Sequence, residues 1–142
     1  MTRRIDQFLG IIAAWKRRDI EAVLAAMSDD IVWHFAAAAE PALVGKAAAR
    51  KFLTRFAADL AEVRWRIFHS AESGDRLFVE GVDEYVTPKG AVVTAPYAGV
   101  IEFSGDLVCG WRDYVDVGVI AAQRRGEAAT RQVKELAARP AL

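Results

Sequence analysis

The stretch LFVEGVDEYVTPKGAVVTAPYAGVIEFSGDLVCGWRDYVDV, residues 77–117, decides the fold. It contains three extended runs, 77–85, 91–103 and 107–117, which are rich in apolar and β-branched residues and are separated by PKG and SGD turns. A fourth run, 63–71, precedes another SGD turn. Long runs joined by short turns predict four antiparallel strands arranged as a meander.

Upstream of these strands, the apolar residues follow a helical period. They recur at spacings of three and four through 5–15, and Asp19 offers an N-cap for a second short helix that ends near 28–30. Residues 31–35 have the composition of a short strand, and 46–60 return to the helical period. The sequence therefore predicts about three helices ahead of the main sheet.

The order of these elements predicts the α+β fold class. Helices followed by a strongly curved antiparallel sheet pack on one face of that sheet, and together they enclose a pocket. The whole chain, 1–142, has the length of a single domain with its own core. Residues 120–138 are rich in Ala, Arg and Glu and predict a C-terminal helical tail.

Composition restricts the expected partners. Basic and acidic residues number 19 each, so no net field attracts nucleic acid or an anionic membrane, and a small apolar molecule is the expected partner. The uncovered sheet face is expected to pair with a second copy as a homodimer.

The lone Cys109 allows no internal disulfide, and a cytoplasmic location is expected. No segment reaches the roughly 20 apolar residues that cross a bilayer, and 1–19 is typical of an amphipathic helix rather than an export signal.

Two aspartates lie on apolar faces of the predicted strands. Because side chains two apart share a face, Asp83 lies between Gly81 and Tyr85, and Asp113 lies beside Trp111. A buried carboxylate is unfavourable unless it is paired or has a function. Burial raises the pKa of a carboxyl, and two neighbouring carboxyls titrate apart, which yields one acid and one base. Surface positions or turn caps are the alternative interpretation of the same residues.

The segments EGVDEY, 80–85, and PYAGVIEFSGDLVCGWRDYVDV, 96–117, carry a family resemblance. They resemble the limonene-1,2-epoxide hydrolase family, within the wider group of nuclear-transport-factor-2-like, SnoaL-like and ketosteroid-isomerase-like cones. The resemblance implies a cone with a curved sheet, and a catalytic pair in which Asp83 is the acid that protonates the epoxide oxygen and Asp113 is the base that activates water.

The chain departs from the pattern of that family at three polar positions. The bridging Arg of the family corresponds to Gly81, and its water-holding Tyr and Asn fall near Phe35 and Ala37, or at Trp33 and Phe35 if a gap is allowed. The acid and the base remain. Three functions therefore stay open: epoxide hydrolysis, isomerisation or cyclisation with one base and one proton donor, and non-catalytic ligand binding by a dimer.

The other candidate site residues are expected to contact the ligand. They are Phe35, Gly81, Tyr85, Tyr97 and Trp111. Tyr97 either orients a ligand or water with its hydroxyl or serves as an aromatic wall. Most other aromatic residues, Trp33 and Trp65 among them, are expected in the core. His34 is expected to face outward, and it has no metal-ligand spacing with His69. With no phosphate-cradling glycine loop either, no cofactor is expected.

Overall fold

The computed structural model describes residues 3–142, which form one seven-stranded sheet and five helices. The helices are α1 (Arg4–Lys16), α2 (Ile20–Ala25), α3 (Lys46–Ala58), α4 (Val117–Arg124) and α5 (Arg131–Ala137). The strands are β1 (Met27–His34), β2 (Leu43–Val44), β3 (Glu62–Val63), β4 (Arg66–Ser73), β5 (Arg76–Val86), β6 (Val92–Ser104) and β7 (Leu107–Val115). The predicted α+β class is confirmed.

The predicted meander is also confirmed. The strands β4, β5, β6 and β7 pair in chain order, each antiparallel to the next. One pair departs from the antiparallel arrangement predicted for the main sheet. The first strand, β1, pairs with β7 in parallel, while β2 pairs antiparallel with β1. The long connection that a parallel pair requires is supplied by α3 and the rest of the meander, which lie between β1 and β7 in the chain.

Helical periodicity located α1, α2 and α3, but α2 ends earlier than predicted. It ends at Ala25, and Ser28–Asp30 belong to β1 rather than to a turn. The pairing of β1 with β7 shifts register between Met27 and Val32. Asp29 and Asp30 are exposed within this irregular part of the strand. A bulge leaves polar side chains in solvent, which explains why the sequence pattern does not mark this run as part of a strand.

Two predicted elements are each divided in the structure. The strand predicted for 63–71 is split into β3 and β4, which both pair with β5 and are separated by Arg64 and Trp65. The predicted C-terminal helical tail is split into α4 and α5. Gly126, between them, has a φ of 95°, a conformation that ends helices and favours glycine.

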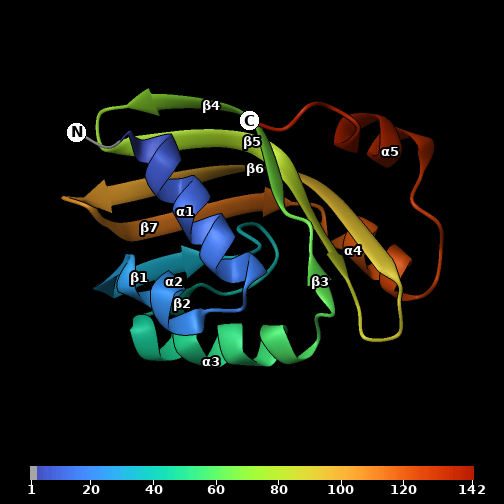
Figure 1. The fold of residues 1–142 in the computed structure, drawn as a ribbon, viewed down its shortest axis with the longest axis horizontal. Coiled ribbons are helices and arrows are strands. Elements are labelled where there is room, and N and C mark those ends of the chain that lie inside the picture. The colour runs from blue at the N-terminus through green and yellow to red at the C-terminus, as the bar shows by residue number, and fades with distance from the viewer. Residues whose placement is uncertain (1–2) are drawn as a thin grey trace.

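The first three helices lie against one face of the sheet. Figure 1 shows α1 crossing this face and α3 running along its lower side, whereas α4 and α5 lie at the far end of β5 and β6. The core between α1 and the sheet contains the fully buried Phe8. Its ring meets Trp65 edge-on at 5.4 Å and Trp111 at 5.3 Å between ring centroids. Packing of α1 therefore fixes the indoles of Trp65 and Trp111.

A buried glutamine links α4 to the sheet. The β6–β7 ladder ends at the pair of Tyr97 and Val115, so the earlier part of β6 has no strand on that side. The buried Gln123 replaces one there: Thr94 N–H donates to its Oε1 at 2.8 Å, and its Nε2 donates to the Thr94 carbonyl at 2.7 Å. An amide side chain thus continues the ladder and positions α4.

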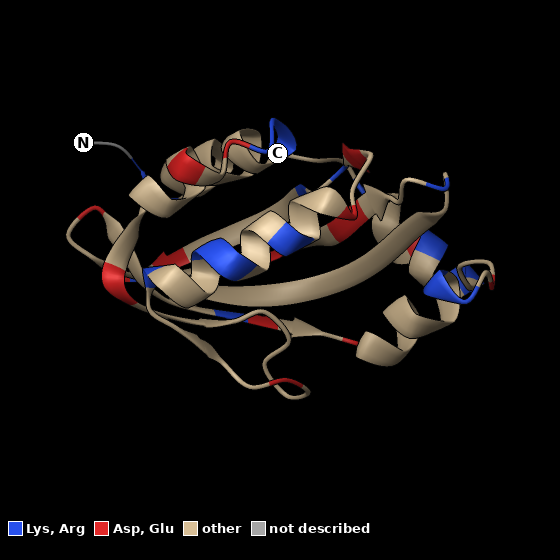
Figure 2. Cartoon of the chain, turned by 90° about the horizontal axis from the view of Figure 1, so that it is seen from below, with Lys and Arg blue, Asp and Glu red and all other residues tan. Residues whose placement is uncertain are grey.

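Charges of both signs are interspersed over the surface. In the view of Figure 2, α3 carries basic residues, and acidic residues lie on other elements around it. Arg50 of α3, for example, forms an ion pair with Glu21 of α2. Within residues 3–142, no helix combines the length and the apolar character needed to cross a bilayer.

We expect Gln123→Leu to loosen α4. The substitution keeps a similar volume but leaves the Thr94 N–H and carbonyl without partners, which costs about 1–3 kcal/mol. Urea unfolding should detect this loss of stability, and hydrogen exchange at the Thr94 amide should accelerate. The exposed Gln132 of α5 supplies the matched control, Gln132→Leu, which should change neither quantity. Unaltered exchange at Thr94 in the Gln123 variant would contradict the role of this side chain.

Candidate active site

A cavity of about 470 Å³ lies between the sheet and the helices. This volume falls within the range of small-molecule sites. Side chains from α1, α2, α3, β1, β5, β6, β7 and α4 contribute to its wall, and nine of the twenty-two lining residues are aromatic. The cavity is therefore predominantly apolar, with few polar groups in its wall.

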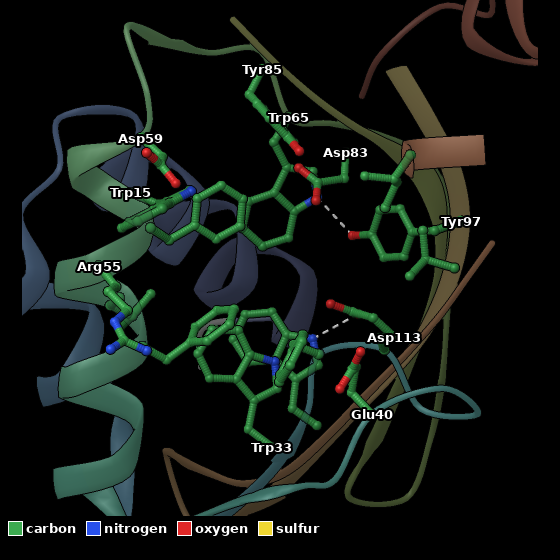
Figure 3. A pocket seen from close by; sticks show the side chains of 18 of the residues that line it. Trp15, Trp33, Glu40, Arg55, Asp59, Trp65, Asp83, Tyr85, Tyr97 and Asp113 are labelled. Carbon is green, nitrogen blue, oxygen red and sulfur yellow. Dashed lines mark hydrogen bonds between the residues drawn. The ribbon is translucent and has the colours of Figure 1, made fainter. Parts of the chain in front are cut away.

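Three polar side chains stand in a row across three adjacent strands. Asp83 on β5 pairs with Ala95 on β6, and Asp113 on β7 pairs with Gly99 on β6. Tyr97 lies between Ala95 and Gly99 on the same face, so it is a diagonal neighbour of both aspartates. Figure 3 shows the three side chains directed into the cavity.

The position of the Asp113 carboxyl is set by Trp111 and Gly99. The indole Nε1–H of Trp111 donates a hydrogen bond to its Oδ1 at 2.9 Å. A Cβ at Gly99 would lie only 2.8 Å from the same oxygen, so the absence of a side chain at this position makes room for the carboxyl. The other carboxyl oxygen, Oδ2, remains free to carry a proton. By contrast, none of the described residues donates a hydrogen bond to the carboxyl of Asp83.

The apolar surroundings raise the pKa of both carboxyls. Burial raises the pKa of Asp83 from 3.8 to about 6. Burial also raises the pKa of Asp113 well above its usual value; the Trp111 N–H opposes this rise, and the negative charge of Asp83 adds to it. Both carboxyls therefore hold their protons to a higher pH than ordinary aspartates do, and the negative charge of Asp83 favours the protonated form of Asp113.

Three tryptophans form a stack beside these groups. Trp111 stacks on Trp33 at 5.2 Å and on Trp65 at 6.0 Å between ring centroids. The Nε1–H of Trp65 donates to the Tyr97 hydroxyl oxygen at 2.7 Å. The Nε1 of Trp33 is buried and has no hydrogen-bond partner among the described residues. Two of the three indoles thus orient polar groups of the cavity.

The remaining charged lining residues are exposed and form the rim. They are Glu40, Arg55, Asp59 and Arg124. Arg124 of α4 donates from Nε to the Tyr85 hydroxyl at 3.0 Å. Within residues 3–142, no group of three or more His, Cys, Asp or Glu side chains is arranged to hold a metal ion.

Most of the site residues expected from the sequence meet at this cavity. Its wall includes both aspartates and four of the expected ligand contacts, namely Phe35, Tyr85, Tyr97 and Trp111. Of the neighbouring residues on the first strand, Trp33 also lines the cavity, whereas His34 does not.

Gly81 was expected to contact the ligand, but it is not part of the cavity wall. A Cβ at this position would lie 2.2 Å from the backbone oxygen of Arg66 and 3.0 Å from a methyl carbon of Ile67. The glycine therefore allows the β4 backbone to approach β5 closely. A side chain as large as Arg at position 81 would require β4 to move.

Sequence reasoning placed Trp65 among the core aromatics and missed its role at the cavity. Strand alternation alone puts Trp65 on the inner face with Val63 and Ile67. Its hydrogen-bond partner is 32 residues further along the chain. No local signal in the sequence links the two residues, and only the pairing of strands brings them together.

Comparisons with known proteins identify the family and the fold. The sequence profile of the SnoaL-like domain matches residues 8–111. The chain belongs to the SnoaL-like family. No curated protein matches the chain in sequence.

Solved structures show the same fold for this SnoaL-like chain. An LEH-like epoxide hydrolase from M. tuberculosis has a TM-score of 0.73 at 23% identity, over 86% of this chain and 90% of that chain. A proposed SnoaL-like polyketide cyclase from Shewanella denitrificans reaches 0.78 at 19% identity, over 88% and 100%. A hypothetical protein with a ketosteroid-isomerase-like fold from Catenulispora acidiphila, in complex with trimethylamine, has a TM-score of 0.75 at 21% identity, over 91% of this chain and 97% of that chain. At these identities the likeness concerns the fold.

Asp83→Asn should stabilise this SnoaL-like chain above about pH 6. Because folding raises the pKa of Asp83 from 3.8 to about 6, the favourable contribution of its neutral form is complete below the unfolded value and is lost as pH rises through the folded value. The shift corresponds to at most about 3 kcal/mol. Urea unfolding should show similar stabilities for variant and wild type at about pH 4, and a more stable variant at about pH 8.

The exposed Asp106 of the β6–β7 turn provides the control for this experiment. Asp106→Asn also removes one carboxylate and should not reproduce the gain at high pH. Identical unfolding curves for Asp83→Asn and wild type at about pH 8 would contradict a raised pKa.

Proposed function

We propose that this SnoaL-like chain is a cofactor-independent enzyme that performs acid–base chemistry on a small apolar molecule bearing an epoxide, carbonyl or enolate oxygen. The observation that carries the proposal is the pair of carboxyls, Asp83 and Asp113, in an aromatic cavity. No cation contributes to the pKa of either group. Carboxyls that are perturbed by burial in a cavity and lack a structural ion pair are typical of catalytic groups.

The proposed roles of the two aspartates follow from their electrostatics. Asp83 is the base, because its negative charge raises the pKa of Asp113, whereas only burial raises the pKa of Asp83. Asp113 is the acid, because it keeps its proton and its Oδ1 accepts from Trp111, which leaves the protonated Oδ2 for the ligand. This assignment is the reverse of the one that the epoxide hydrolase resemblance implies.

The chemistry is a paired proton transfer. Asp83 accepts a proton from water or from a carbon next to a carbonyl group, and Asp113 donates its proton to the oxygen on which negative charge develops. In hydrolysis the resulting hydroxide forms a bond to an epoxide carbon while the carbon–oxygen bond breaks. In isomerisation the double bond shifts through an enol. Each route consumes one proton and releases one.

Isomerisation or cyclisation is the reaction type that the cavity wall favours. Hydrolysis requires groups that hold a water molecule beside the base. The positions of the first strand that supply such groups in epoxide hydrolases correspond here to apolar residues, and Trp33 and Phe35 line the wall. The likeness to an epoxide hydrolase and to a proposed polyketide cyclase supports both types, so the test must include both.

Turnover assays with two substrate panels test this proposal. One panel contains limonene oxide and bulkier cyclic epoxides, and the other contains cyclic β,γ-unsaturated ketones, whose isomerisation is followed by the absorbance of the conjugated product. We expect turnover in the ketone panel to exceed that in the epoxide panel. Asp83→Asn and Asp113→Asn should each reduce turnover by about 10²–10⁴.

The control variant for turnover is Asp106→Asn, which should retain wild-type rates because this exposed carboxylate is remote from the cavity lining. Undiminished turnover in either cavity variant would remove that aspartate from the mechanism. Binding of the same compounds without any turnover would contradict the enzyme proposal and favour a ligand-binding module.

We also propose that the chain forms a homodimer through the sheet face opposite the cavity. Phe78 of β5 and Tyr114 of β7 are respectively 42% and 53% exposed on this face. Exposed aromatic residues on a sheet surface are typical of interaction surfaces. Light scattering at micromolar concentration should give twice the mass of the chain, and Phe78→Glu should reduce it. A wild-type protein with the mass of one chain would overturn this proposal.

A further inference from the structure

Arg124 is a basic residue of the cavity rim whose guanidinium is held in place by neighbouring groups. Its Nε donates a hydrogen bond to the Tyr85 hydroxyl at 3.0 Å, and its guanidinium carbon lies 5.3 Å from the centroid of the same ring. Arg124 directly follows Gln123, whose two hydrogen bonds to Thr94 link α4 to β6. The helix and the tyrosine together therefore position this guanidinium at the rim.

The bond to Tyr85 leaves one edge of the guanidinium unused. A guanidinium carries five N–H donors in a planar fork, and here only Nε is engaged. Among residues 3–142, the terminal Nη1 and Nη2 of Arg124 donate to no side chain or carbonyl, and Arg124 forms no ion pair. Two parallel N–H groups on this free edge match the two oxygens of a carboxylate.

A second arginine, Arg55 of α3, adds positive charge to the rim (Figure 3). Within the described part of the chain, it forms no ion pair, and the two acidic side chains of the rim pair with neither arginine. The next residue, Phe56, meets the Tyr85 ring edge-on at 5.4 Å between ring centroids, which brings α3 close to the partner of Arg124. Both cations therefore remain available to a ligand.

The proposed base lies a short distance along the same strand. Asp83 precedes Tyr85 by two residues on one face of β5, which places their Cα atoms about 7 Å apart. The cavity thus offers a carboxyl pair for a reacting oxygen and, at its rim, cations for a negative group. Repulsion by Asp83 would keep a ligand carboxylate away from the pair and favour the orientation in which that end meets the arginines.

We propose that Arg124 anchors the carboxylate of the substrate at the cavity rim, assisted by the charge of Arg55. The substrate class is then a small apolar acid that carries a keto or epoxide oxygen, with its apolar body in the aromatic cavity, its reacting oxygen at Asp83 and Asp113, and its carboxylate on the free edge of Arg124. This inference rests on the proposed acid–base function of the same cavity, and it makes Arg124 a specificity-determining residue.

Binding of a charged ligand and its neutral counterpart tests the inference. The acid is benzoylvalerate, in which a short alkyl chain joins a keto group to a carboxylate, and the counterpart is benzoylvaleramide, in which a neutral amide replaces the carboxylate. All four tryptophans of the chain line the cavity, so their fluorescence reports its occupancy. At neutral pH the free acid is ionised. We expect wild type to bind the acid about tenfold more tightly than the amide, because charge-assisted hydrogen bonds are stronger than neutral ones.

Substitutions separate a carboxylate anchor from a structural role. Arg124→Gln should remove the preference for the acid, and Arg55→Gln should reduce it by less. A purely structural role of Arg124, through its bond to Tyr85, would weaken the binding of both ligands equally and leave the preference intact. The matched control is Arg125→Gln, since Arg125 is exposed, pairs with Glu127 and does not line the cavity; this variant should keep the preference.

A salt titration of wild type makes the test independent of how Arg124→Gln folds. The rim is exposed, so raising the ionic strength to about 1 M should screen the ion pair and reduce the ratio of acid to amide affinity.

Four results would overturn the inference: equal affinity of wild type for acid and amide, binding of neither, a preference that survives Arg124→Gln, or a preference that does not respond to salt. The ketones and epoxides of the turnover panels carry no carboxylate. Their turnover tests the proposed function separately, so the two failures are distinguishable.

Discussion

The site depends on the way in which α1 holds two stacked indoles. Phe8 is fully buried and packs edge-on against both Trp65 and Trp111, and the two indoles stack on each other. The indole N–H of Trp65 donates a hydrogen bond to the Tyr97 hydroxyl, and that of Trp111 donates one to the carboxyl of Asp113. The same aromatic packing that stabilises the core therefore excludes water, raises the pKa of the carboxyls and fixes the directions of the donors.

Two glycines show how the backbone shapes this arrangement. At Gly99 the missing side chain makes room for the carboxyl of Asp113, and at Gly81 it allows the backbone at Arg66 to approach β5. The second contact is incompatible with the bridging Arg that the epoxide hydrolase resemblance would place there. The departure from that family thus involves the path of β4 as well as the loss of one charge, and it leaves a site with a carboxyl pair and a phenol.

Strand alternation predicted the site better than it predicted the sheet. It placed Asp83, Asp113 and Tyr97 on one face, because a period of two is local and is set by the strand itself. It could not predict the parallel pairing of β1, the division of 63–71 at Trp65, or the ladder contact of Gln123. Each of these depends on residues that are distant in the chain, and no local pattern encodes such partners.

The central claim is that an aromatic cavity raises the pKa of both members of a carboxyl pair. A pH titration of the wild-type protein, followed by the ¹³C carboxyl resonances of its aspartates, measures this directly. The account predicts that Asp83 titrates at about 6 and that Asp113 titrates well above the usual range of aspartate. Titration of both carboxyls near the ordinary aspartate value of about 4 would contradict it.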